Sequence, residues 1–77
     1  MENGQFKDRL KLTRLMRGMT QRDLAKATGL QSTAISFFET GLRLPCFENM
    51  RRLALALDVS ADYLLGLPRG EVKDELP

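Results

Sequence analysis

The stretch TQRDLAKATGLQSTAISFFETG, residues 20–41, decides the fold that this sequence predicts. It contains two short segments with apolar residues at helical spacing, and Gly29 separates them. In the first segment Thr20 and Asp23 are spaced as a capping box, in which each residue bonds the backbone of the other. We therefore expect a helix over about 21–27 that Gly29 closes.

The second segment predicts a short helix over residues 31–39. Ile35 and Phe38 lie three residues apart on one face, which we expect to be core. If the two helices cross steeply over a tight turn, Ala25 is small where they approach, and Gly29 takes the positive φ that the turn needs. Ile35 then fills the space between the helices. These residues together predict a helix-turn-helix.

The opposite face of this helix carries short, polar, uncharged side chains and one aromatic ring. Its residues are Ser32, Thr33, Ser36, Phe37 and Thr40. Ser and Thr let a helix lie close to the edges of DNA bases and exchange hydrogen bonds with them. The alternative is that an exposed helix simply tolerates these residues. For Phe37 three interpretations stay open: contact with a thymine methyl, a ring partly covered by the following loop, and a protein interface.

Three further helices complete the predicted fold. Residues 6–17 are good helix formers, and Gly18 after them is a natural C-cap. Beyond the turn-rich residues 40–45, apolar residues recur at three- and four-residue steps in a fourth helix. These are Phe47, Met50, Leu53, Ala54 and Leu57. Ser60 caps a last short helix, ADYLLG, which stops at Gly66. Strand patterns are missing, so we expect an all-α, compact five-helix bundle.

Composition narrows the classes of function. A chain of 77 residues is one small domain, with a predicted flexible N-terminal arm at 1–5, the helical domain at 6–66 and a flexible C-terminal tail at 67–77. There is one cysteine, Cys46, and no histidine, so the usual zinc-ligand and Cys/His nucleophile arrangements are absent. We expect no enzyme, no metal and no cofactor. Without an apolar span or a signal-peptide core, we expect a soluble cytoplasmic protein.

Charge is informative through its distribution. The net charge is only +2, from 12 basic and 10 acidic residues, which is compatible with nucleic-acid binding without indicating it. The basic surplus lies early: residues 7–26 contain Lys7, Arg9, Lys11, Arg14, Arg17, Arg22 and Lys26 against Asp8 and Asp23. A solvated helix face is the alternative interpretation of that surplus.

The first helix has two apolar faces. Phe6 and Leu10 share one side with Thr13, whereas Leu12, Leu15 and Met16 cluster on the opposite side. The second face suggests a partner surface. The alternative is that Leu15 and Met16 fold beneath a neighbouring loop.

The chain resembles the lambda-repressor-like, Xre-type (Cro/repressor) helix-turn-helix family. The residues that carry the resemblance are TQRDLAKATG, AISFFETG, the proline after them and LALALDVSADYLLG. The match covers about residues 6–66. It implies a bacterial or phage-encoded five-helix protein that binds operator DNA, usually as a homodimer, and regulates transcription, most often as a repressor.

The resemblance also implies roles for single residues. Base contacts in the major groove match Gln31, Ser32, Thr33, Ser36 and Phe37. Phosphate contacts match Gln21, Arg22, Thr40 and Arg43. Arg14 and Glu39 match an ion pair that locks the recognition helix in place without touching DNA.

Three positions depart from the family pattern. Gln31 stands where a capping Ser or Thr is common, and Phe37 stands where a long polar side chain is common. Cys46 replaces a capping serine, which we interpret as structural or neutral. Besides the DNA-binding regulator, we keep a second hypothesis: an antitoxin-like or anti-repressor protein-interaction module that binds its partner through Leu12, Leu15, Met16 and Phe37.

Overall fold

The structure, a computed structural model, describes residues 5–66, and these residues form five α-helices without a strand. The helices are α1 (Phe6–Met16), α2 (Gln21–Thr28), α3 (Ser32–Thr40), α4 (Phe47–Leu57) and α5 (Ala61–Leu65). The predicted all-α five-helix bundle is confirmed. The predicted tail and all of the predicted arm except Gln5 lie outside the described residues.

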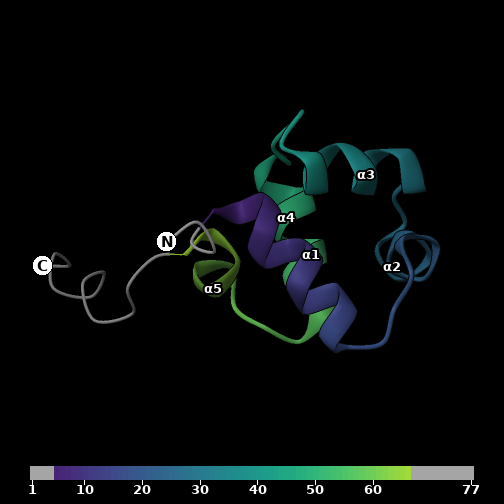
Figure 1. Cartoon of the computed structure of the whole chain (residues 1–77), viewed down its shortest axis with the longest axis horizontal. Coiled ribbons are helices and arrows are strands. Elements are labelled where there is room, and N and C mark those ends of the chain that lie inside the picture. Colours follow the sequence, from purple (N-terminus) through teal and green to yellow (C-terminus); the bar gives the residue numbers. More distant parts are fainter. Residues whose placement is uncertain (1–4, 67–77) are drawn as a thin grey trace, which may run out of the picture.

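The two helices of the motif cross steeply. In Figure 1, α2 is seen nearly end-on while α3 lies across the view above α1. Ala25 and Ile35 are buried, and Gly29 between the helices has a φ of 77°. A side chain at Gly29 would be strained in this left-handed conformation, which explains why a glycine stands at the turn. The predicted helix-turn-helix is therefore present.

Helix starts follow the local signals. The Thr20 hydroxyl accepts a hydrogen bond from the Asp23 N–H at 3.0 Å, and the Asp23 carboxylate accepts one from the Thr20 N–H at 2.9 Å. The predicted capping box is thus complete, and the bond from the Thr20 backbone lowers the pKa of Asp23. The Ser60 hydroxyl likewise accepts from the Tyr63 N–H, as predicted.

Helix α3 is shifted by one residue from the predicted range. Gln31 has extended backbone angles (φ −89°, ψ 151°) and makes no side-chain capping bond, so the helix begins at Ser32. It runs on through Thr40 because Gly41, with a φ of 83°, ends it one residue later than expected. Helix α1 ends at Met16, one residue early, because Arg17 already departs from helical geometry (φ −86°, ψ 1°).

The core takes apolar side chains from all five helices: Phe6, Leu10, Leu24, Ala25, Ile35, Phe38, Met50, Leu53, Ala54, Leu57 and Leu64. One apolar residue of the α4 pattern lies outside this core. Phe47 fits the apolar spacing of α4 but its side chain is 85% exposed. It is the first residue of its helix, and helical side chains lean toward the N-terminus, so its ring points past the end of the helix and away from the core.

No helix within residues 5–66 combines the length and the apolar character that crossing a bilayer requires.

Candidate nucleic-acid interface

Helix α3 presents one polar edge to solvent. Gln31, Ser32, Thr33 and Thr40 are exposed, and Ser36 and Phe37 are half-buried. The other side of the helix is buried through Ile35, Phe38 and Glu39. The residues predicted to contact bases therefore gather on the face of α3 that the rest of the domain leaves open.

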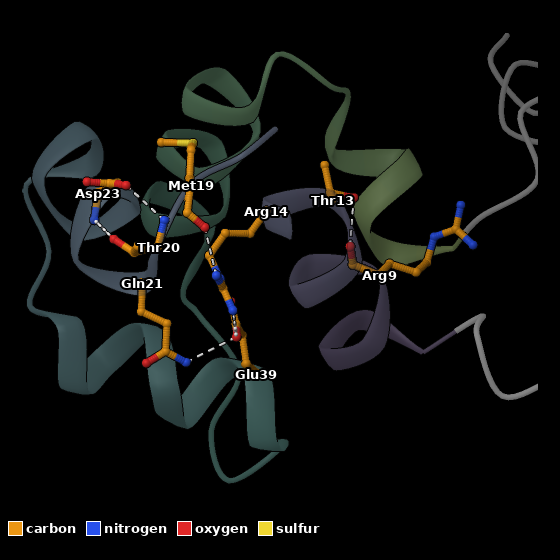
Figure 2. Close-up of polar contacts among 8 residues, drawn as sticks. All are labelled: Arg9, Thr13, Arg14, Met19, Thr20, Gln21, Asp23 and Glu39. Atoms are coloured by element: carbon orange, nitrogen blue, oxygen red, sulfur yellow. Dashed lines mark hydrogen bonds and ion pairs between the residues drawn. The ribbon is translucent and has the colours of Figure 1, made fainter. Parts of the chain in front are cut away.

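A buried ion pair anchors this helix to α1. Arg14 donates from Nε to Glu39 Oε2 at 2.7 Å and from Nη2 to Glu39 Oε1 at 3.0 Å (Figure 2). The side chains are only 8% and 2% exposed. The bonds to Glu39 raise the pKa of Arg14, because they favour its charged form. A third bond runs from Arg14 Nη1 to the Met19 carbonyl at 2.8 Å, which fixes the loop before α2.

Gln21 joins the same network from α2. Its amide nitrogen donates to Glu39 Oε1 at 3.1 Å (Figure 2). An amide nitrogen carries two hydrogens, so one remains for a further acceptor such as a phosphate oxygen. The family resemblance implies a phosphate contact from Gln21, whereas the bond to Glu39 was not predicted. This network ties α1, α2 and α3 together, and it orients the side chain at the start of α2.

Buried polar groups are satisfied throughout the described residues. No buried side-chain nitrogen or oxygen within residues 5–66 lacks a hydrogen-bond partner. Thr13, for example, donates to the Arg9 carbonyl of its own helix at 2.7 Å (Figure 2). Unsatisfied buried groups would cost free energy, so this part of the scaffold is consistent with a single well-defined packing.

Phe37 is partly covered by the loop after α3. The guanidinium of Arg43 lies 5.3 Å from the centroid of the Phe37 ring. Of the three interpretations of this residue, the partly covered ring is confirmed, and contact with a thymine methyl or with a protein partner stays a prediction. The ring is only half-buried, so part of it stays open to a ligand. The other expected phosphate-binding residues, Arg22 and Thr40, are both exposed.

One cation at this face was missed by sequence analysis. A Cβ added to Gly41 would lie 2.8 Å from Lys7 Cδ, so the stem of Lys7 crosses the backbone directly after α3. Among residues 5–66, Lys7 Nζ pairs only with the neighbouring Asp8, at 3.3 Å, and the Lys7 side chain is 40% exposed. No sequence pattern relates positions 7 and 41, because only the packing of α1 against α3 brings them together.

The second apolar face of α1 is open. Leu12, Leu15 and Met16 are 47%, 55% and 72% exposed. The interpretation that Leu15 and Met16 fold beneath a neighbouring loop is therefore wrong. Asp8 and Lys11 line a shallow hollow together with Leu12 and Leu15, which mixes charges with this apolar surface.

Within residues 5–66, no three His, Cys, Asp or Glu side chains lie close enough together to hold a metal ion. Cys46 is a free, exposed thiol at the N-cap of α4, and its side chain makes no capping bond.

Comparison with known families places the fold. A family model described as helix-turn-helix matches residues 10–64. This chain belongs to the lambda-repressor-like, Xre-type helix-turn-helix family. The match spans the helix-turn-helix and α4 in full and most of α1 and α5, and it confirms the resemblance noted from the motifs.

Named helix-turn-helix proteins are similar over most of this chain. An uncharacterized HTH-type transcriptional regulator, YqaE of Bacillus subtilis, is 32% identical over 71 residues, 92% of this chain and 59% of that protein. The cryptic phage CTXphi transcriptional repressor RstR of Vibrio cholerae is 36% identical over 61 residues, 79% of this chain and 54% of that protein. The chain thus spans between half and two thirds of these curated relatives.

A solved helix-turn-helix structure shares the architecture. The P22 c2 repressor, crystallised with a synthetic operator, superposes with a TM-score of 0.78 at 35% identity. The alignment covers 80% of this chain and 96% of that one.

Proposed function

We propose that this helix-turn-helix protein is a sequence-specific, double-stranded-DNA-binding transcriptional regulator that acts as a repressor. The observation that carries the proposal is the polar, uncharged and open edge of α3, held in place from behind by the Arg14–Glu39 pair. A helix that reads bases needs both features: short hydrogen-bonding side chains in front and a fixed orientation. Similarity to a repressor solved with its operator supports the same function.

In this proposal α3 enters the major groove. Bases are contacted by Gln31, Ser32, Thr33, Ser36 and Phe37, and phosphates by Gln21, Arg22, Thr40 and Arg43. Lys7 adds a cation from α1 beside the end of α3. The phosphate contacts set the position of the domain on the duplex, and the base contacts set the sequence preference.

We further propose that the protein works as a homodimer in the cytoplasm, on half-sites about one helical turn apart. One α3 reaches only a few base pairs, so two copies are needed to select a single operator among many sites. Residues 6–66 form the DNA-binding domain in this proposal, and no enzymatic step is required of it.

A second candidate function rests on the open face of α1. Leu12, Leu15 and Met16 form an exposed apolar cluster on the side of α1 away from its buried residues. Such a cluster suits contact with another protein, as in an antitoxin-like or anti-repressor module. Phe37 supports this candidate less than expected, because Arg43 covers part of its ring.

Selection from a random duplex pool with the purified chain tests the two candidates. An enriched two-fold motif is expected, and binding to it should weaken steeply as salt rises, because phosphate contacts release counterions. Absence of enrichment, with weak binding at every salt concentration, would contradict the regulator and favour the protein-partner function.

Single substitutions then test the proposed roles. Gln31→Ala and Ser36→Ala should each relax the preference at one base pair by about 1–3 kcal/mol. Gln21→Ala should weaken binding to all sequences alike, since a phosphate contact carries no sequence information. If none of the three substitutions changed operator selection or affinity, the assignment of α3 as the reading helix would be wrong.

A further inference from the structure

The loop after α3 is built around a single residue of that helix. The Phe37 carbonyl accepts hydrogen bonds from the backbone N–H groups of Gly41, Leu42 and Arg43, the last two at 3.0 and 3.3 Å. The Thr40 hydroxyl donates to the same oxygen at 3.2 Å. The backbone of Arg43 is thereby tied to Phe37, which limits how far its side chain can move from the ring.

The side chains of Arg43 and Phe37 are also in contact. The Arg43 guanidinium lies over the Phe37 ring at 5.3 Å from the centroid, within the range of a cation–π contact. Arg43 forms no ion pair within residues 5–66, so no carboxylate there competes with the ring for it. Arg43, which lies outside the helix, therefore contacts the face of the Phe37 ring.

The ring and the guanidinium also border the same hollow. A depression of about 380 Å³ lies between α3 and the following loop, and its lining includes Thr33, Phe37, Arg43 and Pro45. Thr33 lies one helical turn before Phe37 and is among the proposed base contacts. A base edge that approaches α3 at this point would meet the ring and its guanidinium cover together.

We propose that Arg43 is a positioning residue for base recognition: by stacking on Phe37 it holds the ring in the orientation that contacts an apolar base edge, such as the methyl of thymine. This proposal rests on the proposed DNA-binding function and deepens it. A phosphate contact alone would make Arg43 blind to sequence. Stacking on Phe37 makes it a determinant of the preference at the base pair that Phe37 reads.

Two substitutions separate charge from stacking. Arg43→Lys keeps the positive charge and loses the planar guanidinium that stacks on the ring, whereas Arg43→Gln loses both. Arg22→Gln is the matched control, because Arg22 is a second exposed cation among the proposed phosphate contacts. The base pair that Phe37 reads is first located as the one where Phe37→Ala relaxes the preference. The affinity of each variant is then measured by fluorescence anisotropy for the selected operator and for operators changed at that base pair, including one with deoxyuridine in place of thymidine.

We expect Arg43→Gln, which removes the cation, to reduce the discrimination at that base pair by about two- to fivefold, the effect of losing an exposed cation–π contact. Arg43→Lys should reduce it less, because an ammonium keeps a cation–π contact but lacks the planar group that stacks on the ring. Arg22→Gln should leave the discrimination unchanged while weakening all operators alike. In the Phe37→Ala background, Arg43→Lys should have no further effect on discrimination, because the ring it positions is gone.

The proposal is overturned if Arg43→Gln keeps the wild-type preference, if the Arg43 variants weaken every operator equally, or if Phe37→Ala relaxes no base pair. In those cases the wild-type chain still binds its operator, and the proposed function stands. A wild-type chain that selects no operator would instead refute the proposed function and this assignment with it. Proton NMR of the free protein checks the stack itself: the Arg43 side-chain protons should lose a ring-current shift in Phe37→Ala.

Discussion

The buried pair between Arg14 and Glu39 makes the strongest prediction for stability. Glu39→Gln keeps the shape of the side chain and removes its charge, so the Arg14 guanidinium stays buried without a counter-ion. Removing one partner of a buried pair costs about 3–5 kcal/mol. A small domain has about 5–15 kcal/mol of total stability, so the substitution should remove a large part of it.

The contacts of the pair set the expected size of this effect. Arg14 gives two of its hydrogen bonds to Glu39, and Glu39 accepts a third from Gln21. Replacing both partners, in Arg14→Met with Glu39→Leu, removes the buried charges and leaves only the Met19 carbonyl and the Gln21 amide without their partners. Each lost bond costs about 1 kcal/mol. The double variant should therefore be more stable than Glu39→Gln alone.

Urea unfolding followed by far-UV circular dichroism measures these differences, because urea is uncharged and does not screen ion pairs as guanidinium chloride does. Glu48→Gln is the matched control: Glu48 pairs with Arg51 and Arg52 at the surface, where both arginine side chains are about half exposed, and the substitution should change stability little. If Glu39→Gln cost less than about 1 kcal/mol, the Arg14–Glu39 pair would be worth no more than a surface pair, and the anchoring argument would fail.

Three further predictions concern the helix caps of the fold. Thr20→Ala removes the hydroxyl that caps α2 and should lower the free energy of unfolding by about 1 kcal/mol, seen as a lower urea midpoint with an unchanged slope. The pKa of Asp23 is lower in the folded state than in the unfolded state. The carboxylate therefore contributes fully to folding stability above its unfolded-state pKa, and this contribution is lost as the pH falls through its folded-state pKa. The stability difference between wild type and Asp23→Asn should thus be largest near neutral pH and should close in acid; a difference independent of pH would contradict the capping box. Gly41→Ala and Gly18→Ala should each cost about 1–2 kcal/mol, because both positions have positive φ. A neutral Gly41→Ala in thermal or urea unfolding would contradict the left-handed C-cap of α3.

Some features of this protein follow from neighbours in the chain. The capping box of Thr20 and Asp23, the cap at Ser60 and the left-handed Gly29 each involve residues within a few positions of one another. Hydrogen bonds and backbone conformations of this kind depend on local sequence, so residue spacing alone predicts them. The burial of Ile35 and Phe38 followed in the same way, from the helical period of the apolar residues.

Helix ends were less predictable than helix faces. The start of α3 moved from Gln31 to Ser32 because the backbone of Gln31 is extended, although residue 31 fits the helical pattern. Phe47 fits the apolar period of α4, yet its side chain is exposed. Periodicity assigns a residue to one face of a helix. It does not say whether another element packs against that face at the residue's position along the helix.

The details of the candidate site were decided by tertiary structure. Gln21 bonds Glu39, Arg43 covers Phe37, and the stem of Lys7 crosses Gly41. Arg43 and Phe37 are six positions apart but meet only because the loop after α3 folds back on the helix. The Gln21–Glu39 bond joins α2 to α3, and Lys7 of α1 meets the residue that ends α3, so both contacts depend on how α1, α2 and α3 pack. The sequence by itself therefore determined which helices form and which faces they bury, since those properties are local. Only the packed structure decided which polar and aromatic side chains meet around α3, because such contacts depend on the relative placement of separate elements.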